Sequence, residues 1–407
     1  MESCSYGAFS EDFHRKLIRR RVPLDGTIEI TQRCPLHCSH CYNCLPMEDA
    51  GVRRDEFTYE EHCRILDDIT EAGCLWVLFT GGEIFAREDF PDIYTYAKKK
   101  GLLITLFTNA TLITSQIADH LAQWPPFSIE TTLYGRTRKT HERITGIPGS
   151  FEKCLRGIQL LKERNLPLKI KTMAVTGNKH EIWDMKEFVQ KDLGLEFRFD
   201  AMLNPRIDCS RHPLAYRLTP AEVVELDLLD PARKDTWKSF ACRFNGPVHA
   251  AAGSDEMYHC GGGISSFSIN PQGKMSLCTL SRFDSYDLRT GSFKDAWEHY
   301  LYNVRCKKIT RMTKCVSCEM KAMCGMCPAN GELDRRDPES PVDFMCQVAH
   351  LRSYALDIPV KDHGECEYCE GGNAYAHIKD LAAYLKKKTI STGSTSDEFN
   401  TDRCAIV

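Results

Sequence analysis

Residues 27–41 have the sequence TIEITQRCPLHCSHC, which carries the strongest structural signal in the chain. A β-rich run leads directly into three cysteines with the spacing C-x3-C-x2-C, namely Cys34, Cys38 and Cys41. Three thiolates on one tight loop can bind three irons of a [4Fe–4S] cube and leave the fourth iron open for another ligand. A zinc site is the alternative interpretation, and it would need a fourth ligand from Cys44, His37 or His40.

Outward from this stretch, short β-rich runs alternate with amphipathic helical patterns as far as residue 201. Strands are expected at 27–31, 76–80, 103–108, 127–133, 168–175 and 196–201, and helices at 58–72, 92–100, 115–121, 150–165 and 179–191. Such alternation predicts an α/β fold with a parallel sheet and right-handed crossovers. Six units fit a partial (β/α)6 barrel better than a closed barrel of eight.

The composition is that of a globular protein without a nucleic-acid partner. The net charge is −3, so the chain lacks the basic surface of a nucleic-acid binder. No apolar run approaches the roughly 20 residues of a membrane helix, and no export signal is expected at the N-terminus. With 21 cysteines and no such signal, the chain is expected to bind metal in a reducing cytoplasm rather than to form a disulfide framework.

A second polar motif follows the second expected strand. Gly81, Gly82 and Glu83 stand where this strand ends, at the edge of an α/β sheet where ligands collect. The glycines would allow a close backbone approach to a ligand, and the Glu83 carboxylate could face a cation.

The two motifs together resemble the radical S-adenosylmethionine (SAM) superfamily over residues 27–201. The resemblance implies that the three cysteines bind a [4Fe–4S] cluster and that SAM chelates its open iron. Cleavage of SAM would then give a 5′-deoxyadenosyl radical that abstracts hydrogen from a substrate. The residues that the resemblance places around SAM are His40, Gly81, Gly82, Glu83, Thr108, Asn109, Thr132 and Arg143. For Thr132 and Arg143, capping or solvated roles are the alternative.

A second group of cysteines lies toward the C-terminus. Its members are Cys260, Cys278, Cys315, Cys318, Cys324, Cys327 and Cys346. These are too many for one zinc ion, although two zinc ribbons are an alternative. Their order resembles the SPASM domain of radical SAM enzymes, which implies two auxiliary [4Fe–4S] clusters and three in all. By this resemblance one cluster takes Cys315, Cys318, Cys324 and Cys346, and the other takes Cys260, Cys278 and Cys327, with Cys242 or an open position as the fourth.

Further expectations concern the remaining segments. Residues 270–273, Asn-Pro-Gln-Gly, predict a hairpin turn with Cys260 and Cys278 on neighbouring strands. Helices are expected near 220–229 and 378–388, while Cys366 and Cys369 are interpreted as two thiols in a loop rather than as metal ligands. The expected parts are an N-terminal extension (1–26), a radical SAM core (27–203), a linker and helix (204–241), a SPASM-like domain (242–350), a closing segment (351–388) and a disordered tail (389–407).

The resemblance to SPASM enzymes also implies a peptide substrate. The expected reaction is oxidation of a ribosomally made precursor to a thioether or carbon–carbon crosslink, with an auxiliary cluster accepting an electron. The alternatives are a sulfatase-maturase-like or small-molecule radical SAM oxidase and, in another class, a non-catalytic iron–sulfur or zinc-binding protein. Asp200 and Asp208, near the last expected strand, are the candidate catalytic residues, with ordinary loop polarity as the alternative.

Three partners are expected. They are a precursor peptide, a reductant such as flavodoxin or ferredoxin, and a separate peptide-recognition protein, because the segment before Cys34 is short. Neither nucleic acid nor a membrane is expected.

Overall fold

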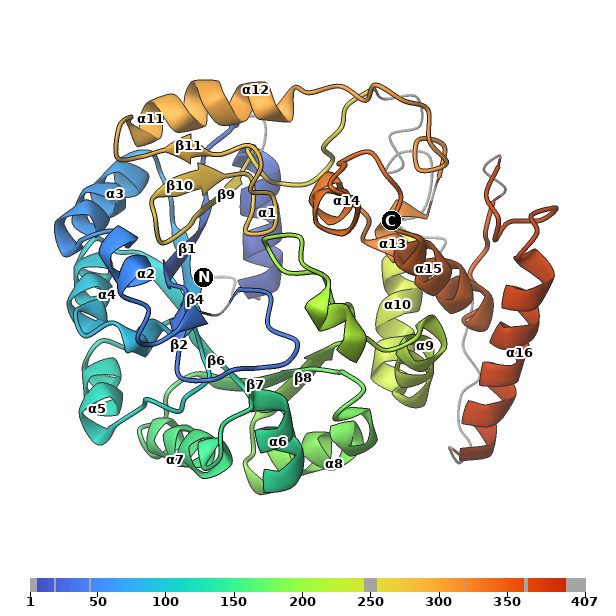
Figure 1. Cartoon of the computed structure of the whole chain (residues 1–407), viewed down its shortest axis with the longest axis horizontal. Coiled ribbons are helices and arrows are strands. Elements are labelled where there is room, and N and C mark those ends of the chain that lie inside the picture. The colour runs from blue at the N-terminus through green and yellow to red at the C-terminus, as the bar shows by residue number, and fades with distance from the viewer. Residues whose placement is uncertain are drawn as a thin grey trace, which may run out of the picture. The chain divides into compact units, whose positions relative to one another are not determined.

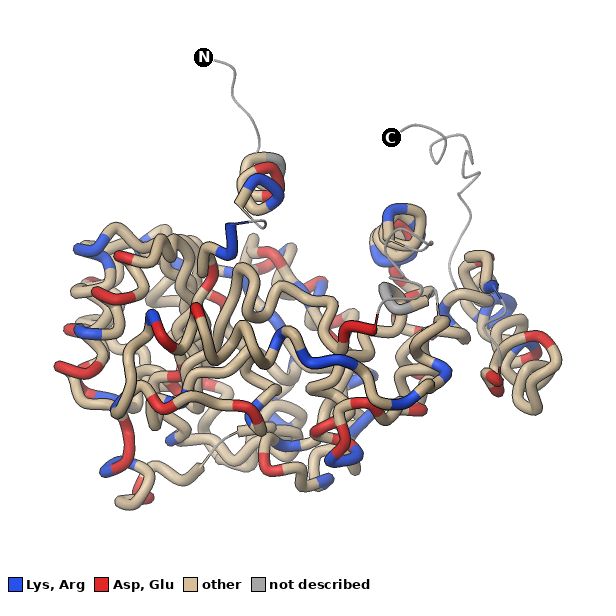
Figure 2. Tube along the Cα trace, turned by 90° about the horizontal axis from the view of Figure 1, so that it is seen from above, with Lys and Arg blue, Asp and Glu red and all other residues tan. Residues whose placement is uncertain are grey.

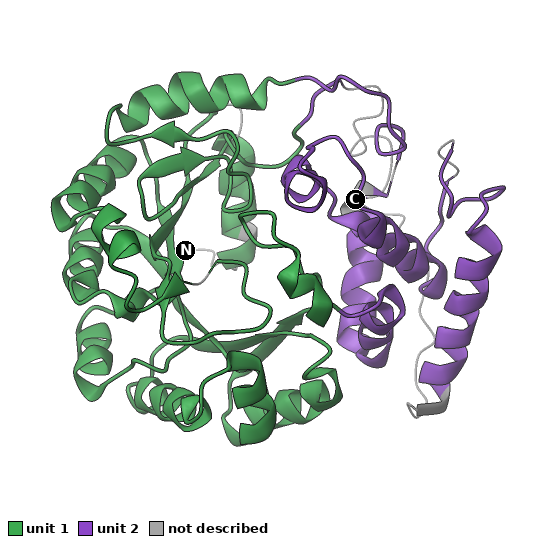
Figure 3. Cartoon of the chain, in the orientation of Figure 1, with its two compact units in different colours: residues 1–217, 258–307 green, residues 218–257, 308–407 purple. Residues whose placement is uncertain are grey.

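The structure is a computed structural model that describes residues 6–17, 20–43, 45–244, 255–318, 320–361 and 365–392. Cys44 and residues 393–407, most of the expected tail, lie outside these ranges. The chain divides into two compact units, residues 1–217 with 258–307 and residues 218–257 with 308–407 (Figure 3). The expected SPASM-like segment, 242–350, is thus divided between the units.

Six parallel strands form the centre of unit 1 and confirm the predicted partial barrel (Figure 1). In their sheet order they are β1 (Asp25–Thr31), β4 (Trp76–Gly81), β5 (Leu103–Thr108), β6 (Ser128–Thr132), β7 (Leu168–Met173) and β8 (Glu196–Asp200). Neighbouring strands pair in parallel throughout this set, as strands joined by helical crossovers do.

Helices cover the outer side of this curved sheet (Figure 1). The predicted ones are α3 (Tyr59–Glu71), α4 (Phe90–Lys99), α5 (Ser115–Gln123), α7 (Ser150–Glu163) and α8 (Ile182–Glu187). Thr58 and Glu61 form a capping box that starts α3. Apolar side chains that alternate along the strands, such as Ile28, Phe79 and Leu106, are buried in this layer. Their neighbours in sequence therefore line the concave face.

A helix that sequence reasoning missed, α6 (Arg138–Thr145), precedes α7. Its local signals are Thr137, whose side chain accepts a hydrogen bond from the Thr140 N–H, and Gly146, which ends the helix with φ of 71°. Glu181 also accepts hydrogen bonds from the backbone of Arg136 and Thr137. The start of α6 is therefore fixed by a residue far along the chain.

The hairpin predicted at residues 270–273 is present, and it extends the sheet beyond β1. β9 (Ser266–Ile269) pairs in parallel with β1 and antiparallel with β10 (Lys274–Ser276), which is followed by β11 (Tyr286–Asp287). Cys260 and Cys278 lie just before and just after this hairpin rather than on its strands, so that expectation was wrong.

The described residues of unit 2 are mainly helical. Its helices are α9 (Pro220–Leu229), as predicted, α10 (Pro231–Phe244), α13 (Lys321–Cys324), α14 (Pro328–Arg335), α15 (Asp343–Ala355) and α16 (Tyr375–Thr392). α16 contains the predicted helix and is longer. A buried ion pair, Arg352 with Asp227 at 2.8 Å, joins α15 to α9. Such a long-range pair explains why local composition alone did not reveal these helices.

Lysines and arginines are interspersed with aspartates and glutamates along the chain (Figure 2). Among the described helices, none combines the length and apolar character needed to cross a membrane.

Candidate active site

The loop with Cys34, Cys38 and Cys41 begins in β2 (Arg33–Cys34), which pairs with β3 (Leu45–Pro46). Its backbone is attached to the C-terminal end of α6, because the His37 N–H donates to the Thr145 carbonyl at 2.8 Å and the Ser39 N–H to the Ile144 carbonyl at 3.0 Å. These bonds hold the loop over the carboxyl ends of the strands.

Two glycines join this loop to the end of β4. A Cβ on Gly81, whose φ is 143°, would lie 2.1 Å from the Thr31 carbonyl oxygen, and one on Gly82 would lie 2.4 Å from that of Arg33. The Gly82 N–H donates to the Thr31 carbonyl at 2.7 Å, and the Glu83 N–H to that of Arg33 at 2.9 Å. The close approach that both glycines permit is therefore to the chain's own backbone, which places Glu83 beside the thiol loop.

Glu83 is fully buried at the centre of this arrangement. One carboxylate oxygen accepts a hydrogen bond from the Thr108 hydroxyl and the other from the Asn109 N–H, both at 2.7 Å. The Asn109 side-chain nitrogen lies 3.4 Å from Cys34 Sγ. Burial raises the pKa of Glu83 to about 7, so the carboxylate favours a cationic neighbour.

The three thiols match the ligand set of a cluster. Burial, with a smaller contribution from Glu83, raises the pKa of Cys34 to about 12, and burial raises that of Cys38. Positive charge from metal is therefore needed to hold these sulfurs as thiolates. Among the described residues, the three sulfurs are not gathered within 4.8 Å of one another as ligands of a single ion would be.

His40 is buried beside the same loop. Its ring packs edge-on against Tyr134, with the centroids 4.7 Å apart, and burial lowers its pKa to about 4. Its Nδ1 atom has no hydrogen-bond partner among the residues that the structure describes. A buried polar atom of this kind fits a site that takes a ligand.

The structure does not bring the other predicted residues together in the same way. Thr132 ends β6 on the concave face. Arg143 is exposed and donates to the Gly177 carbonyl at 2.5 Å. Asp200 and Asp208 are both exposed, and each accepts a backbone hydrogen bond at 2.8 Å, from Met202 and Ser210 respectively. Asp200 is the last residue of β8, and Asp208 lies in a later turn.

Sequence reasoning missed a buried ion pair under the loop. Glu29 of β1 is fully buried and pairs with Arg282, which lies after Cys278. Its other oxygen accepts from the Asn43 amide at 2.7 Å, and the Asn43 N–H lies 3.5 Å from Cys41 Sγ. The signal that could have indicated it is a glutamate between two buried isoleucines, Ile28 and Ile30, in the same strand.

Charged side chains of opposite sign line the concave face of β6, β7 and β8. Lys171 lies 3.2 Å from Glu130 and above the Phe107 ring, and burial lowers its pKa to about 8. Lys169 lies 3.1 Å from Glu196, which also contacts Arg198. Each described cation of these three strands therefore has a carboxylate partner.

Some of the C-terminal cysteines lie close to one another in the structure. In unit 2, the Cys324 thiol donates to the sulfur of Cys346 on α15, which lowers the Cys346 pKa. Cys318 is close enough to contribute to the raised Cys324 pKa. Cys315 lies in the turn before Cys318, and Cys327 is the residue directly before α14. Cys242 lies in α10 and is disulfide-bonded, so its expected role as a cluster ligand was wrong. In unit 1, Arg305 lies 3.9 Å from Cys260 Sγ.

The barrel, the thiol loop and the buried carboxylate lie in one segment of the chain. Residues 28–191, which carry the thiol loop, the carboxylate and most of the barrel, match the model of the Radical SAM superfamily. This match implies a [4Fe–4S] cluster and SAM, and the donor set described above fits both.

Individual relatives are similar over the same core. The AdoMet-dependent heme synthase of Methanosarcina barkeri is 31% identical over 41% of this chain and 46% of its own length. The PqqA peptide cyclase of Granulibacter bethesdensis is 31% identical over 41% of this chain and 44% of its own length. The matched region thus spans a little under half of these relatives.

A solved structure shares the fold over most of the chain. Streptococcus suis SuiB bound to the precursor peptide SuiA superposes with a TM-score of 0.59 and 16% identity, covering 85% of this chain and 82% of that one. The match supports the fold of the core and of the cysteine-rich C-terminal region.

Proposed function

We propose that this radical SAM enzyme oxidises a peptide, forming a thioether or carbon–carbon crosslink in a ribosomally made precursor. The observation that carries the proposal is the contact of Asn109 with both Cys34 and Glu83, which sets a cluster ligand beside a carboxylate suited to the SAM amine. When bound, the cluster and SAM supply one-electron chemistry that removes a hydrogen atom from a C–H bond.

In this proposal Cys34, Cys38 and Cys41 hold the cluster. Glu83, fixed by Thr108 and the Asn109 backbone, orients the amine. His40 offers its unpartnered nitrogen and its ring to the bound ligand. The remaining residues proposed to contact SAM are Gly81, Gly82, Thr132 and Arg143.

The concave face favours a peptide over a porphyrin, the substrate class suggested by the heme synthase relative. A porphyrin with several carboxylates would need cations that are not already neutralised. The cations of β7 and β8 are paired with Glu130 and Glu196. Such alternating charge suits the amides and mixed side chains of a peptide, as the PqqA peptide cyclase and peptide-bound SuiB also suggest.

We further propose two auxiliary clusters as electron acceptors. One would use Cys315, Cys318, Cys324 and Cys346. The other would use Cys260, Cys278 and Cys327 with an open fourth position, because Cys242 is disulfide-bonded in the structure. Bond formation from a substrate radical releases an electron, which a nearby cluster can accept. Three cubes require about twelve irons per chain. A flavodoxin or ferredoxin would supply the electron that reduces the SAM-binding cluster. A separate protein would present the peptide. The enzyme would work in a reducing cytoplasm, where its thiols stay reduced.

The test is anaerobic reconstitution with iron, sulfide, SAM and dithionite. Synthetic peptides from short cysteine-containing reading frames beside the gene serve as substrates. We expect release of 5′-deoxyadenosine and peptide that has lost two hydrogen atoms, measured by mass spectrometry. Turnover of an iron porphyrin instead of any peptide would overturn the substrate proposal, and intact SAM would overturn the whole function.

Variants separate the two roles of the cysteines. Cys34→Ala should abolish SAM cleavage. Cys346→Ala should retain cleavage but lose crosslinked product, and Cys63→Ala, on α3 outside both sets, should retain both. Normal product from Cys346→Ala would contradict the electron-acceptor role.

A further inference from the structure

Three buried metal-binding side chains meet in unit 2, outside the cysteine sets discussed above. His350 lies on α15, and Cys366 and Cys369 lie in the turn that precedes α16. Their exposed fractions are 2%, 3% and 1%. All three ligand atoms lie within 4.8 Å of one another, which holds for no other such group among the described residues.

The distances fit one tetrahedral ion. His350 Nε2 lies 3.5 Å from Cys366 Sγ and 3.6 Å from Cys369 Sγ. A tetrahedral Zn²⁺ with Zn–N of about 2.0–2.1 Å and Zn–S of about 2.3 Å holds its nitrogen and sulfur ligands about 3.5 Å apart. Ligands of a cube bind separate irons and stand farther apart, so this group matches a mononuclear site.

The histidine is oriented for such a site. Its Nδ1 atom lies 2.7 Å from the Cys346 carbonyl oxygen, to which the Nδ1–H donates. This bond fixes the tautomer and leaves the Nε2 lone pair directed at the two sulfurs. A ligating histidine almost always has a partner of this kind on its other nitrogen.

The turn with the two cysteines is also fixed. The Cys369 N–H lies 3.3 Å from the Cys366 carbonyl, and the Gly372 N–H donates to that of Cys369 at 2.9 Å. Gly371 has φ of 85°, and a Cβ on Gly372 would lie 2.5 Å from the Cys366 carbonyl oxygen. The thiols are therefore held in place by a turn that needs both glycines.

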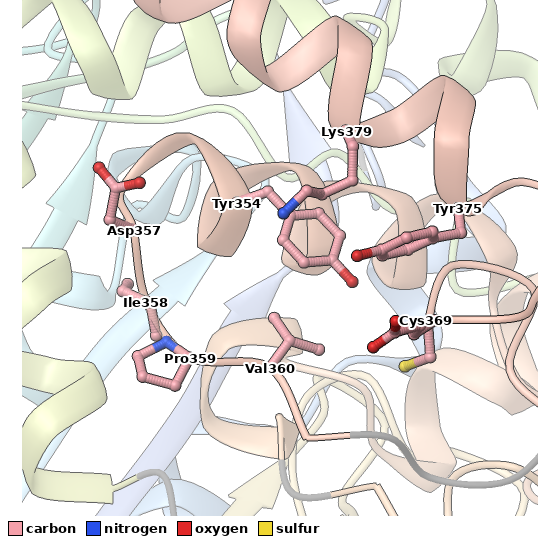
Figure 4. A pocket seen from close by; sticks show the side chains of 9 residues that line it. Tyr354, Asp357, Ile358, Pro359, Val360, Cys369, Tyr375 and Lys379 are labelled. Atoms are coloured by element: carbon pink, nitrogen blue, oxygen red, sulfur yellow. The ribbon is translucent and has the colours of Figure 1, made fainter.

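A pocket borders Cys369, one of the three side chains of this group. A pocket of about 310 Å³ is lined by Cys369 together with Tyr354, Tyr375 and Lys379 (Figure 4). The ligand loop is also supported from a turn earlier in the chain. Lys314 in that turn forms an ion pair of 2.5 Å with Glu367, which lies between the two cysteines. A metal site needs an entry path and a supported ligand loop.

We propose that His350, Cys366 and Cys369 bind one Zn²⁺ ion, separate from the iron–sulfur clusters, that fixes the turn before α16 to α15. Two thiolates and one imidazole are ligands that zinc prefers, and a water or further protein group completes the tetrahedron. Binding releases the two thiol protons, so the ion's double charge is balanced by the two thiolates. The proposal is independent of the substrate proposed above.

Metal analysis of the full chain, purified anaerobically and dialysed against a mild chelator, tests the site without any variant. We expect one zinc per chain in addition to iron. Zinc-edge X-ray absorption should show two sulfurs at about 2.3 Å and one nitrogen at about 2.0–2.1 Å. Absence of zinc, or zinc with four sulfur neighbours, would overturn the proposal.

A double variant, Cys366→Ser with Cys369→Ser, identifies the ligands. Zinc should fall from one to none per chain while iron content and cluster absorbance are unchanged, and hydrogen exchange at residues 365–375 should become faster. Cys63→Ser is the matched control and should retain zinc. Retained zinc in the double variant would show that these thiols are not the zinc ligands. Loss of the iron of one cluster would show that they bind an iron–sulfur cluster instead.

Discussion

The side-chain nitrogen of Asn109 lies 3.4 Å from the sulfur of Cys34. Hydrogen bonds to cluster sulfurs are among the factors that set the reduction potential of an iron–sulfur cluster. We therefore expect Asn109→Ala to make the potential of the SAM-binding cluster more negative, as measured by EPR-monitored redox titration. The backbone N–H that holds Glu83 is retained in this variant.

Thr111→Val is the control for this change. The Thr111 hydroxyl donates to the Asn109 side-chain oxygen at 2.6 Å, so the control disturbs the same turn and leaves the amide beside the sulfur. An equal shift of potential in both variants would show that the turn, and not the hydrogen bond, sets the value.

Gly82→Ala should destabilise the chain and reduce cluster loading. The new Cβ would meet two backbone carbonyl oxygens, at 2.4 and 2.5 Å, and backbone cannot move aside as a flexible side chain can. Overpacking of this kind costs about 1–3 kcal/mol. Thermal unfolding of the metal-free chain and iron content after reconstitution measure the two effects.

Gly7→Ala is the comparison for this prediction, because Gly7 lies in α1 (Tyr6–Leu17) and a Cβ there meets nothing within 4 Å. It should not destabilise the chain, since alanine favours a helix over glycine. Equal melting temperatures for the two variants would contradict the steric argument.

Removal of Arg282 should destabilise the chain through Glu29. Arg282→Met leaves a fully buried carboxylate without its cation, and breaking a buried pair typically costs about 3–5 kcal/mol. Glu29→Gln in the same chain should recover much of this loss, because it removes the unpaired charge. Chemical denaturation of the four members of the double-mutant cycle measures the coupling, and additive effects would argue against the pair.

Lys171 should give the chain a pH-dependent stability in the alkaline range. Burial lowers its pKa to about 8 in the folded chain, whereas an unfolded lysine titrates near 10.4. Between these values the unfolded chain binds more protons, so the contribution of Lys171 to stability rises with pH. Lys171→Met should lose this rise, as measured by the free energy of unfolding from about pH 7 to 10. Parallel curves for variant and wild type would show that Lys171 titrates normally.

The barrel core could be predicted because its signals are local. The six parallel strands and the helices α3, α4, α5, α7 and α8 each carry their own periodicity, and the thiol spacing lies within eight residues. The helices of unit 2 gave weaker signals, since α15 is buried on several sides and therefore lacks a clear polar face. Their positions depend on long-range pairs such as Arg352 with Asp227.

The amino-acid pattern alone predicts a parallel α/β protein with a three-cysteine loop after its first strand. It also indicated a carboxylate after the second strand and a cysteine-rich C-terminal region. The folded chain is needed to see which side chains meet: Asn109 with Cys34, Glu29 with Arg282, and His350 with the Cys366 and Cys369 thiols. Spacing along a chain fixes local periodicity, whereas contacts between distant residues depend on how whole elements pack.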